Sequence, residues 1–441
     1  MNFLRIAVFA FAATLGFNGV LAIDTPAPKV VVYLGGTLFD GTLAPAKANM
    51  TIVTRAERIV AVLPADGYHA PNEVEIVDAH GKFIIPGLIN SHVHLATSAD
   101  PAIAKAYLRR ELYSGITAVR DMAGDVRLLT ELKREAEFDE IPSPDIYYAA
   151  LMAGPEFFQD PRTHDAARGR IAGEVPWMRG VTRQTNLQIA IAEAYGTGAT
   201  GIKIYADLSA PLVAAITAEA HRQNMLVWAH ATVFPARPRD ITDAGVDVMS
   251  HACFLGYQVS DTIPAGMVYP LPMVDAAKFS RPNADMSALY EDMKSRGTIL
   301  DATLYPNFKH DPFGCTFAVT AQITNEAYLA GVPIAAGTDD DPDWKDAYSA
   351  LDVELGLMVK RAGMTAADAI RSATLIGART IGRDKDMGTI EVGKLANLVV
   401  LDEDPLKDIS NIRSVYITVK NGIRYPHSKY TAVTPEPVKS D

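Results

Sequence analysis

Apolar runs of four to seven residues alternate with helical segments through the middle of the chain. These runs span residues 84–90, 115–119, 146–151, 201–205, 226–229, 246–250, 298–303 and 332–336. Nearly continuous apolar runs are typical of strands buried on both faces of a parallel sheet, and eight strand–helix units close into a barrel. The pattern therefore predicts an α/β fold with a (β/α)8 TIM barrel, and an open doubly wound sheet is the alternative.

A different pattern, short stretches in which apolar and polar residues alternate, lies on both sides of the barrel. It predicts antiparallel strands at residues 30–33, 49–53, 58–62, 396–401 and 412–420, with a hairpin turn at Asn421-Gly422. We expect residues 27–86 and 383–426 to form one small β-sandwich domain beside a barrel of residues 87–382. Residues 427–441 are polar and contain two prolines, which predicts a loose tail.

The first 22 residues have the pattern of a signal peptide. Arg5 precedes an apolar stretch from residue 6 to residue 15, and small residues lead to Ala22. Because this stretch is too short to span a bilayer, we expect no stable membrane anchor. The sequence therefore predicts secretion into the periplasm or the extracellular space.

Composition narrows the class of protein further. The chain has 441 residues, is 49% hydrophobic, and carries a formal charge of −11 without a run of lysine or arginine. These values exclude a disordered chain and argue against a nucleic-acid partner. Cys253 and Cys315 are interpreted as two buried thiols, while a single bridge between them stays open, as does assembly into a homo-oligomer.

Polar side chains follow the apolar runs at the carboxyl ends of the predicted strands, where barrel enzymes carry their reacting residues. They are His92, His94, Arg120, Asp121, Lys203, His230, His251 and Asp339. We expect His92 and His94 to reach one ion from the same side, because alternate residues of a strand share a face. Four imidazoles and a carboxylate at one edge predict a site for Zn²⁺ or a similar ion.

Lys203 lies inside the fourth apolar run, where a charged amine in a barrel core carries a desolvation penalty. A neutral lysine amine can capture carbon dioxide and become a carbamate, which is a negatively charged ligand able to bridge two ions. Pairing of Lys203 with Asp207 or another acid is the alternative.

Six segments, in this order along the chain, resemble the amidohydrolase superfamily. They are PGLINSHVHL (86–95), GIKIY (201–205), VWAHA (227–231), VMSHA (248–252), AAGTDD (335–340) and GTIEVGKLANLVVLDEDPL (388–406). Within that superfamily the chain is similar to the imidazolonepropionase-like and Xaa-Pro dipeptidase-like groups. It departs from many dipeptidase-like relatives in having residues 206–209, Ala-Asp-Leu-Ser, where they have a glycine-rich stretch.

The resemblance implies two divalent ions, expected to be Zn²⁺, at the mouth of the barrel. His92, His94 and Asp339 would hold the first ion. His230 and His251 would hold the second, and carbamylated Lys203 and a hydroxide would bridge the pair. The resemblance also implies a catalytic role for Asp339, which would take the proton from the attacking water and pass it to the leaving amine.

We therefore expect a secreted metal-dependent hydrolase that cleaves a C–N bond of a small amide or peptide, with a dipeptidase as the first hypothesis. A mononuclear zinc deaminase or a cyclic-amide hydrolase of the same superfamily is the alternative. Such deaminases resemble one another in a glutamate about three residues after the fifth-strand histidine, where this chain has Val233. A non-catalytic binding protein is less favoured, because all six ligand positions are filled.

Substrate contacts are expected from two places in the sequence. His164 and Arg168 lie in the long segment 152–181, where an arginine can bind a carboxylate. Tyr205 and Tyr257 follow ligand positions closely and can donate a hydrogen bond to a carbonyl or its tetrahedral intermediate. Solvated loop charges and packing around the metal site are the respective alternatives.

Overall fold

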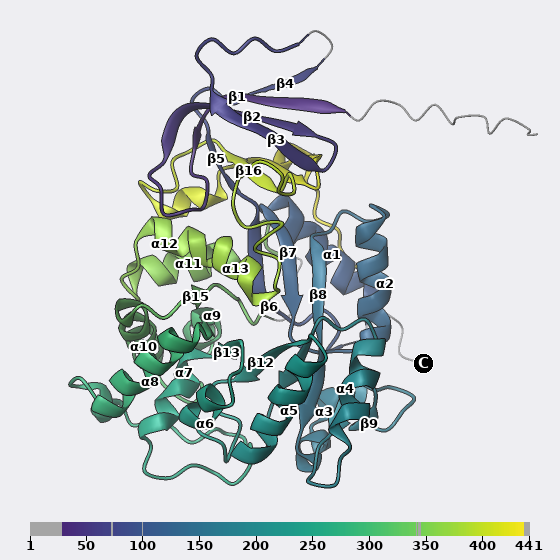
Figure 1. Ribbon diagram of the computed structural model, residues 1–441, viewed down its shortest axis with the longest axis vertical. Coiled ribbons are helices and arrows are strands. Elements are labelled where there is room, and N and C mark those ends of the chain that lie inside the picture. The colour runs from purple at the N-terminus through teal and green to yellow at the C-terminus, as the bar shows by residue number, and fades with distance from the viewer. Residues whose placement is uncertain (1–28, 72–73, 99, 341, 343–344, 436–441) are drawn as a thin grey trace, which may run out of the picture.

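The computed structural model describes residues 29–71, 74–98, 100–340, 342 and 345–435, which form a barrel with a second sheet at one end (Figure 1). The predicted signal peptide, residues 1–22, lies outside the described residues. Among the residues that are described, no helix is both long enough and apolar enough to cross a membrane.

Eight parallel strands form the barrel wall in the described part of the chain. They are β6 (Leu88–Val93), β7 (Ile116–Asp121), β8 (Asp145–Ala153), β11 (Gly201–Ile204), β12 (Leu226–His230), β13 (Val248–Ser250), β14 (Ile299–Asp301) and β15 (Ile334–Ala335). Each strand pairs with the next one in this order. The Ser91 N–H donates to Ala336 O over 2.9 Å, which brings the two ends of the wall together. The predicted TIM barrel is confirmed.

Helices cover the outside of this wall (Figure 1). They are α1 (Pro101–Tyr113), α2 (Val126–Glu137), α4 (Leu187–Gly196), α5 (Ala210–Arg222), α6 (Pro238–Asp243), α8 (Ala284–Arg296), α10 (Phe317–Ala330), α11 (Leu351–Lys360), α12 (Ala366–Ser372) and α13 (Leu375–Thr380). Helix α5 shows why they pack there. Its buried residues are spaced three or four apart and form one apolar face: Val213, Ile216, Thr217 and Ala220.

Shorter elements lie mainly in the loops. The short α-helices are α3 (Pro161–Ala166), α7 (Ala252–Leu255) and α9 (Leu304–Lys309), and the small strands are β9 (Glu174–Val175) and β10 (Met178–Gly180). The 3₁₀ turns are η1 (Pro155–Gln159), η2 (Gly256–Val259), η3 (Ala276–Phe279), η4 (Ile409–Arg413) and η5 (His427–Lys429). Helices α3, α7 and α9 follow β8, β13 and β14, so they lie at the edge of the barrel where the strands end.

The second sheet is built from both ends of the described chain. Its strands are β1 (Val30–Leu38), β2 (Lys47–Arg55), β3 (Arg58–Pro64), β4 (Glu75–Asp78), β5 (Phe83–Pro86), β16 (Leu398–Leu401), β17 (Val415–Lys420) and β18 (Ile423–Pro426). Their order is β18-β17-β16-β5-β1-β2-β3, with β4 beside β1. Antiparallel pairing of β5 with β16 joins the two ends, which confirms that the flanks share one β unit.

The structure differs locally from the sequence expectation at the first barrel strand, at His94 and at the start of the predicted tail. The first apolar run, 84–90, divides at Gly87 into β5 and β6, and a Cβ at Gly87 would lie 2.3 Å from Thr117 Oγ1. Strand β6 ends at Val93, so His92 lies in the strand and His94 directly after it. In the predicted loose tail, His427 stacks on Tyr348 with ring centroids 5.1 Å apart, while residues 436–441 lie outside the described residues.

The interpretation of the two cysteines as free thiols is wrong. Cys253 and Cys315 form a disulfide, with 5.9 Å between their Cα atoms. They are 62 residues apart in the chain, and only the folding of the segment before α10 against α7 brings them together.

Candidate metal centre and active site

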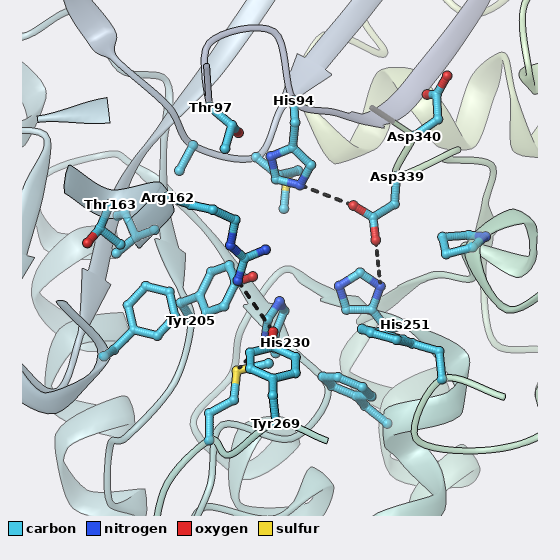
Figure 2. Close-up of a pocket in the computed structure, with 18 of the residues that line it drawn as sticks. His94, Thr97, Arg162, Thr163, Tyr205, His230, His251, Tyr269, Asp339 and Asp340 are labelled. Atoms are coloured by element: carbon cyan, nitrogen blue, oxygen red, sulfur yellow. Dashed lines mark hydrogen bonds and ion pairs between the residues drawn. The ribbon is translucent and has the colours of Figure 1, made fainter. Parts of the chain in front are cut away.

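The carboxyl ends of the barrel strands open into a cavity of about 290 Å³ (Figure 2). Five of the predicted site residues line it: His94, Tyr205, His230, His251 and Asp339. Two others, His92 and Lys203, are fully buried beside them, with exposed fractions of 1% and 0%. The structure therefore brings all six predicted ligands to one end of the barrel.

Asp339 lies at the centre of this cluster. Its Oδ1 is 3.1 Å from His94 Nε2 and 3.4 Å from His92 Nε2, and its Oδ2 is 3.7 Å from His251 Nδ1. His92, His251 and Asp339 each offer a ligand atom, and these atoms all lie within 4.8 Å of one another. The ring centroid of His230 is 4.8 Å from that of His251, so the fourth imidazole borders the same space.

Two of these residues have a left-handed backbone. Asp339 has φ 47° and His251 has φ 73°, a region that non-glycine residues rarely adopt. Hydrogen bonds hold both: the Asp339 N–H donates to His92 O, and the His251 N–H donates to Asp301 O, each over 2.9 Å. Backbone strain of this kind persists where the surrounding structure enforces it, typically at functional sites.

Burial favours the neutral, metal-binding form of three of the four clustered imidazoles. It lowers the pKa of His251 to about 3, although the charge of Asp339 opposes the shift, and it lowers the pKa of His230 well below its ordinary value. Burial likewise lowers the pKa of His92. Because a neutral imidazole has a free lone pair, these three residues suit metal binding at neutral pH.

The two remaining members of the cluster titrate differently. Burial alone would lower the pKa of His94, but the hydrogen bond and charge of Asp339 raise it overall. Burial alone would raise the pKa of Asp339, yet its electrostatic interaction with His92 and the hydrogen bond from His94 lower it. Asp339 is therefore an ionised carboxylate at neutral pH.

Lys203 is a buried amine whose Nζ has no hydrogen-bond partner among the described residues. Burial, reinforced by the charge of Arg120, lowers the pKa of Lys203 to about 7. The alternative pairing with Asp207 is absent, because the Asp207 carboxylate accepts a hydrogen bond from the Met267 N–H instead. A large share of Lys203 is therefore the neutral amine at neutral pH.

Unpaired nitrogen atoms test whether metal ions fit here. Lys203 Nζ, His94 Nδ1 and His230 Nδ1 are buried and have no hydrogen-bond partner among the residues described. Buried polar atoms are nearly always paired, so several unpaired donors beside one cavity need an explanation. Imidazole and carboxylate groups are the ligands that Zn²⁺ prefers, and the cluster therefore fits a metal centre.

Three of the expected substrate residues do not reach the cavity. The Tyr257 hydroxyl donates to Pro272 O over 2.6 Å, and this ring packs at 5.1 Å on Phe234. His164 Nε2 lies 2.9 Å from Phe158 O, and the Arg168 side chain is 72% exposed and pairs with Asp165. Neither His164, Arg168 nor Tyr257 lines the cavity, whereas Tyr205 does.

Arg162 is the arginine that the structure places in the cavity, and the sequence interpretation missed it. It lies at the start of α3, two residues before His164, and Figure 2 shows its guanidinium pointing toward Tyr205 and Tyr269. Its Nη2 is 3.4 Å from the Tyr269 hydroxyl. The signal was present in the long segment 152–181, but only the start of α3 decides which of its basic residues faces inward.

Arg120 and Asp121 are buried in β7, and their hydrogen bonds hold the chain next to the site residues. Arg120 donates to Asp301 Oδ2 over 2.8 Å and to Ser91 O over 2.6 Å. Asp121 accepts from the Leu95 N–H over 2.6 Å, which fixes the chain directly after His94. Neither residue lines the cavity.

Comparison of the sequence with known proteins assigns the chain to a family. The model of the amidohydrolase family matches residues 83–424. The chain belongs to this family, and it is a hydrolase that acts on carbon–nitrogen bonds.

Among curated proteins, the chain is 24% identical over 391 residues to imidazolonepropionase of Symbiobacterium thermophilum, covering 83% of this chain and 86% of that protein. It is 29% identical over 229 residues to N-acyl-D-aspartate deacylase of Alcaligenes xylosoxydans xylosoxydans, covering 51% of this chain and 41% of the deacylase. Among solved structures, a Xaa-Pro dipeptidase with bound methionine superposes with a TM-score of 0.71 at 23% identity. That match covers 90% of this chain and 100% of the dipeptidase.

Proposed function

We propose that the chain is a secreted hydrolase with two divalent ions, and that it cleaves the amide bond of a small substrate carrying a free carboxylate. The clustering of five donor residues with Lys203, whose buried Nζ has no hydrogen-bond partner in the described part of the chain, carries this proposal. His92, His94 and Asp339 would hold one ion, His230 and His251 the other, and carbamylated Lys203 would be shared. Such ions, expected to be Zn²⁺, supply an activated water nucleophile and polarise a carbonyl oxygen.

The carbamate rests on the chemistry of the Lys203 amine. The neutral nitrogen attacks carbon dioxide, the N–C bond forms as one C–O π bond of carbon dioxide breaks, and one N–H proton leaves to solvent, so that a neutral amine becomes an anion. A pKa of about 7, caused by burial and by the charge of Arg120, makes the attacking neutral form available. A negative group at this position would complement positive ions, where a lysine ammonium would repel them.

Asp339 is the residue in this site whose carboxylate lines the cavity and has a lowered pKa. Burial opposes that shift, while the electrostatic interaction with His92 and the hydrogen bond from His94 cause it. Asp339 would accept the proton of the attacking water and deliver it to the leaving amine nitrogen, so that the amine leaves neutral.

The walls of the cavity indicate the kind of substrate. Phe157, Phe254 and Met267 supply apolar surface, while the lining acids, Asp339 and Asp340, both belong to the turn after β15. Away from that turn Arg162 faces inward from α3 with its guanidinium paired to Asp160, and the end of α9 contributes Lys309. A guanidinium and an ammonium in the cavity wall can bind a substrate carboxylate.

The relatives agree with this substrate class. The names of the N-acyl-D-aspartate deacylase and the Xaa-Pro dipeptidase describe an acylated amino acid and a dipeptide. Both kinds of molecule combine an amide bond with a carboxylate. We therefore extend the proposal to dipeptides and N-acyl amino acids, with a dipeptidase as the first activity to assay.

Metal content tests the proposed centre. Protein purified with bicarbonate and Zn²⁺ should hold about two ions per chain, and Lys203→Ala should lose at least one of them together with amide hydrolysis. Lys420→Met is the matched control, because Lys420 is also a buried lysine, 1% exposed, but lies in β17 of the second sheet. One ion per chain that survives Lys203→Ala would overturn the two-ion centre.

Secretion has its own test. Cleavage after Ala22 would leave residue 23 as the mature N-terminus. N-terminal sequencing of protein recovered from the periplasm or medium should find it, and recovery of the uncleaved chain in the cytosol alone would contradict secretion.

A further inference from the structure

Asp301, at the end of β14, is a buried carboxylate on which three donors converge. His92 Nδ1 lies 2.7 Å from its Oδ2, Arg120 Nη2 lies 2.8 Å from the same oxygen, and the Ser250 hydroxyl donates to it over 3.0 Å. The Asp301 side chain is 0% exposed. None of the motifs in the sequence singled this residue out.

The contact with His92 decides which ring nitrogen carries the proton. A carboxylate oxygen is an acceptor, so the hydrogen bond of 2.7 Å requires the proton on His92 Nδ1. The lone pair of the neutral ring then lies on Nε2, the atom that is 3.4 Å from Asp339 Oδ1. Histidines that bind metals are commonly fixed in this way by a carboxylate on the other nitrogen.

Arg120 balances the negative charge of the Asp301 carboxylate. Its guanidinium is fully buried, contacts Ser91 O and lies over the Trp228 ring at 4.9 Å. Because Arg120 already balances the negative charge of Asp301, the contact with His92 does not need a protonated, cationic imidazole. The arrangement holds a neutral ring in one tautomer and one orientation.

Asp301 also reaches a second strand of the site. Its backbone carbonyl accepts the His251 N–H over 2.9 Å, and the Ser250 hydroxyl that bonds its side chain precedes His251. Gly337 packs against the pair from the other side, since a Cβ there would lie 2.4 Å from Asp301 Oδ1 and 2.6 Å from His92 Cβ. The residue is therefore fixed between β6, β13 and the turn after β15.

We propose that Asp301 is a positioning residue, which holds the proton on His92 Nδ1 and presents His92 Nε2 for metal binding. The metal-binding half of this inference rests on the proposed function, whereas the choice of tautomer does not. The two halves are therefore measured separately.

The tautomer is measured on metal-free protein with ¹⁵N-labelled histidine, by two-bond ¹H–¹⁵N spectra. The parent should show His92 with the proton on Nδ1, and Asp301→Ala should shift it toward Nε2 or a mixture. Since Asp301→Ala leaves Arg120 buried without its counterion, the double variant Asp301→Ala/Arg120→Met keeps the charge balanced and should show the same shift. Ser250→Ala removes a donor but keeps the acceptor, so it should retain the parent tautomer.

Zn²⁺ affinity is then measured by chelator competition on the same variants. Loss of the Asp301 carboxylate should lower the affinity for the more tightly bound Zn²⁺ by about 10- to 100-fold. Ser250→Ala should leave that affinity unchanged. A folded double variant with the parent tautomer and the parent affinity would overturn the proposal. If the parent binds no Zn²⁺ while its His92 tautomer still depends on Asp301, the positioning role stands and the proposed metal centre fails.

Discussion

At the scale of single residues, the site depends on a few buried or inward-facing side chains with distinctive hydrogen bonding. Lys203 is buried and its Nζ has no hydrogen-bond partner within the described ranges, and Asp301 accepts three hydrogen bonds on one oxygen. Arg162 keeps a guanidinium in the cavity, where Asp160 binds its Nη2 over 2.6 Å. Each of these residues has a role that depends on one or two atoms, so single substitutions test them.

Arg162→Met should weaken the binding of substrates that have a free carboxylate. Loss of a charge-assisted hydrogen bond costs about 1.5–3 kcal/mol, so kcat/KM for a dipeptide should fall about 10- to 100-fold. The fall should appear mainly in KM, because a contact with a carboxylate that does not react stabilises bound substrate and transition state alike. Steady-state kinetics on a dipeptide and on its C-terminal amide provide the comparison.

Two controls accompany Arg162→Met. Arg168→Met alters an exposed arginine of the same segment that does not line the cavity, and it should behave as the parent. If Arg162→Met lowers turnover of the dipeptide and its amide equally, Arg162 does not read the carboxylate, although the hydrolase assignment would stand.

At the scale of elements, α9 depends on a partner helix for its N-terminus. Thr303 precedes α9 with φ 45° and supplies no side-chain cap. The Glu354 carboxylate of α11 instead accepts the N–H groups of Leu304 and Tyr305, over 3.0 and 2.8 Å. Since α9 carries Tyr305 and Lys309 into the cavity wall, α11 fixes part of the substrate site.

Glu354 should also make stability depend on pH. Burial raises its pKa to about 8, against about 4.3 in an unfolded chain. A raised acid pKa means that folding favours the protonated form, so this contribution to stability is complete below about pH 4.3 and is lost as pH rises to about 8.

Glu354→Gln removes this titration. The difference in unfolding free energy, variant minus parent, should become more positive from pH 5 to 8, with a slope approaching about 1.4 kcal/mol per pH unit. Urea unfolding at a series of pH values measures this difference. Loss of one backbone acceptor adds an offset that does not vary with pH, so a flat difference would contradict the raised pKa.

At the scale of the whole molecule, the second sheet is attached to the barrel by a buried charge. Lys420 of β17 donates to Ala136 O over 2.9 Å and pairs with Asp145 at 3.1 Å, and its side chain is 1% exposed. Ala136 belongs to α2 and Asp145 begins β8, so one amine connects the sheet with two elements of the barrel. Lys420 thus couples the stability of both units.

Lys420→Met should destabilise the fold by about 2 kcal/mol, because it leaves Asp145 and a backbone carbonyl without their partner. Thermal melts should show one lowered transition, with metal content unchanged. The exposed Lys407→Met is the control and should change stability by less than about 0.5 kcal/mol. An unchanged melting temperature for Lys420→Met would show that this contact does not couple the units.

The sequence by itself determined the barrel and the positions of the six donors. Strands buried on both faces must be apolar, so their periodic runs are visible in the chain, and the carboxyl ends of parallel barrel strands all lie at one edge. His230 and His251 are placed by this rule without knowledge of any contact. The shared β unit was also visible in the sequence, since stretches in which apolar and polar residues alternate mark strands at the two flanks.

Only the tertiary structure decided which side chains meet. Asp301 and His92 are 209 residues apart, the bridged cysteines are 62 apart, and Lys420 meets Asp145 across two units. Arg162, rather than His164 or Arg168, faces the cavity because of how α3 is oriented. Local patterns report burial and periodicity, whereas a pair of partners depends on the distance between remote backbones, which is set when the barrel closes and its loops pack.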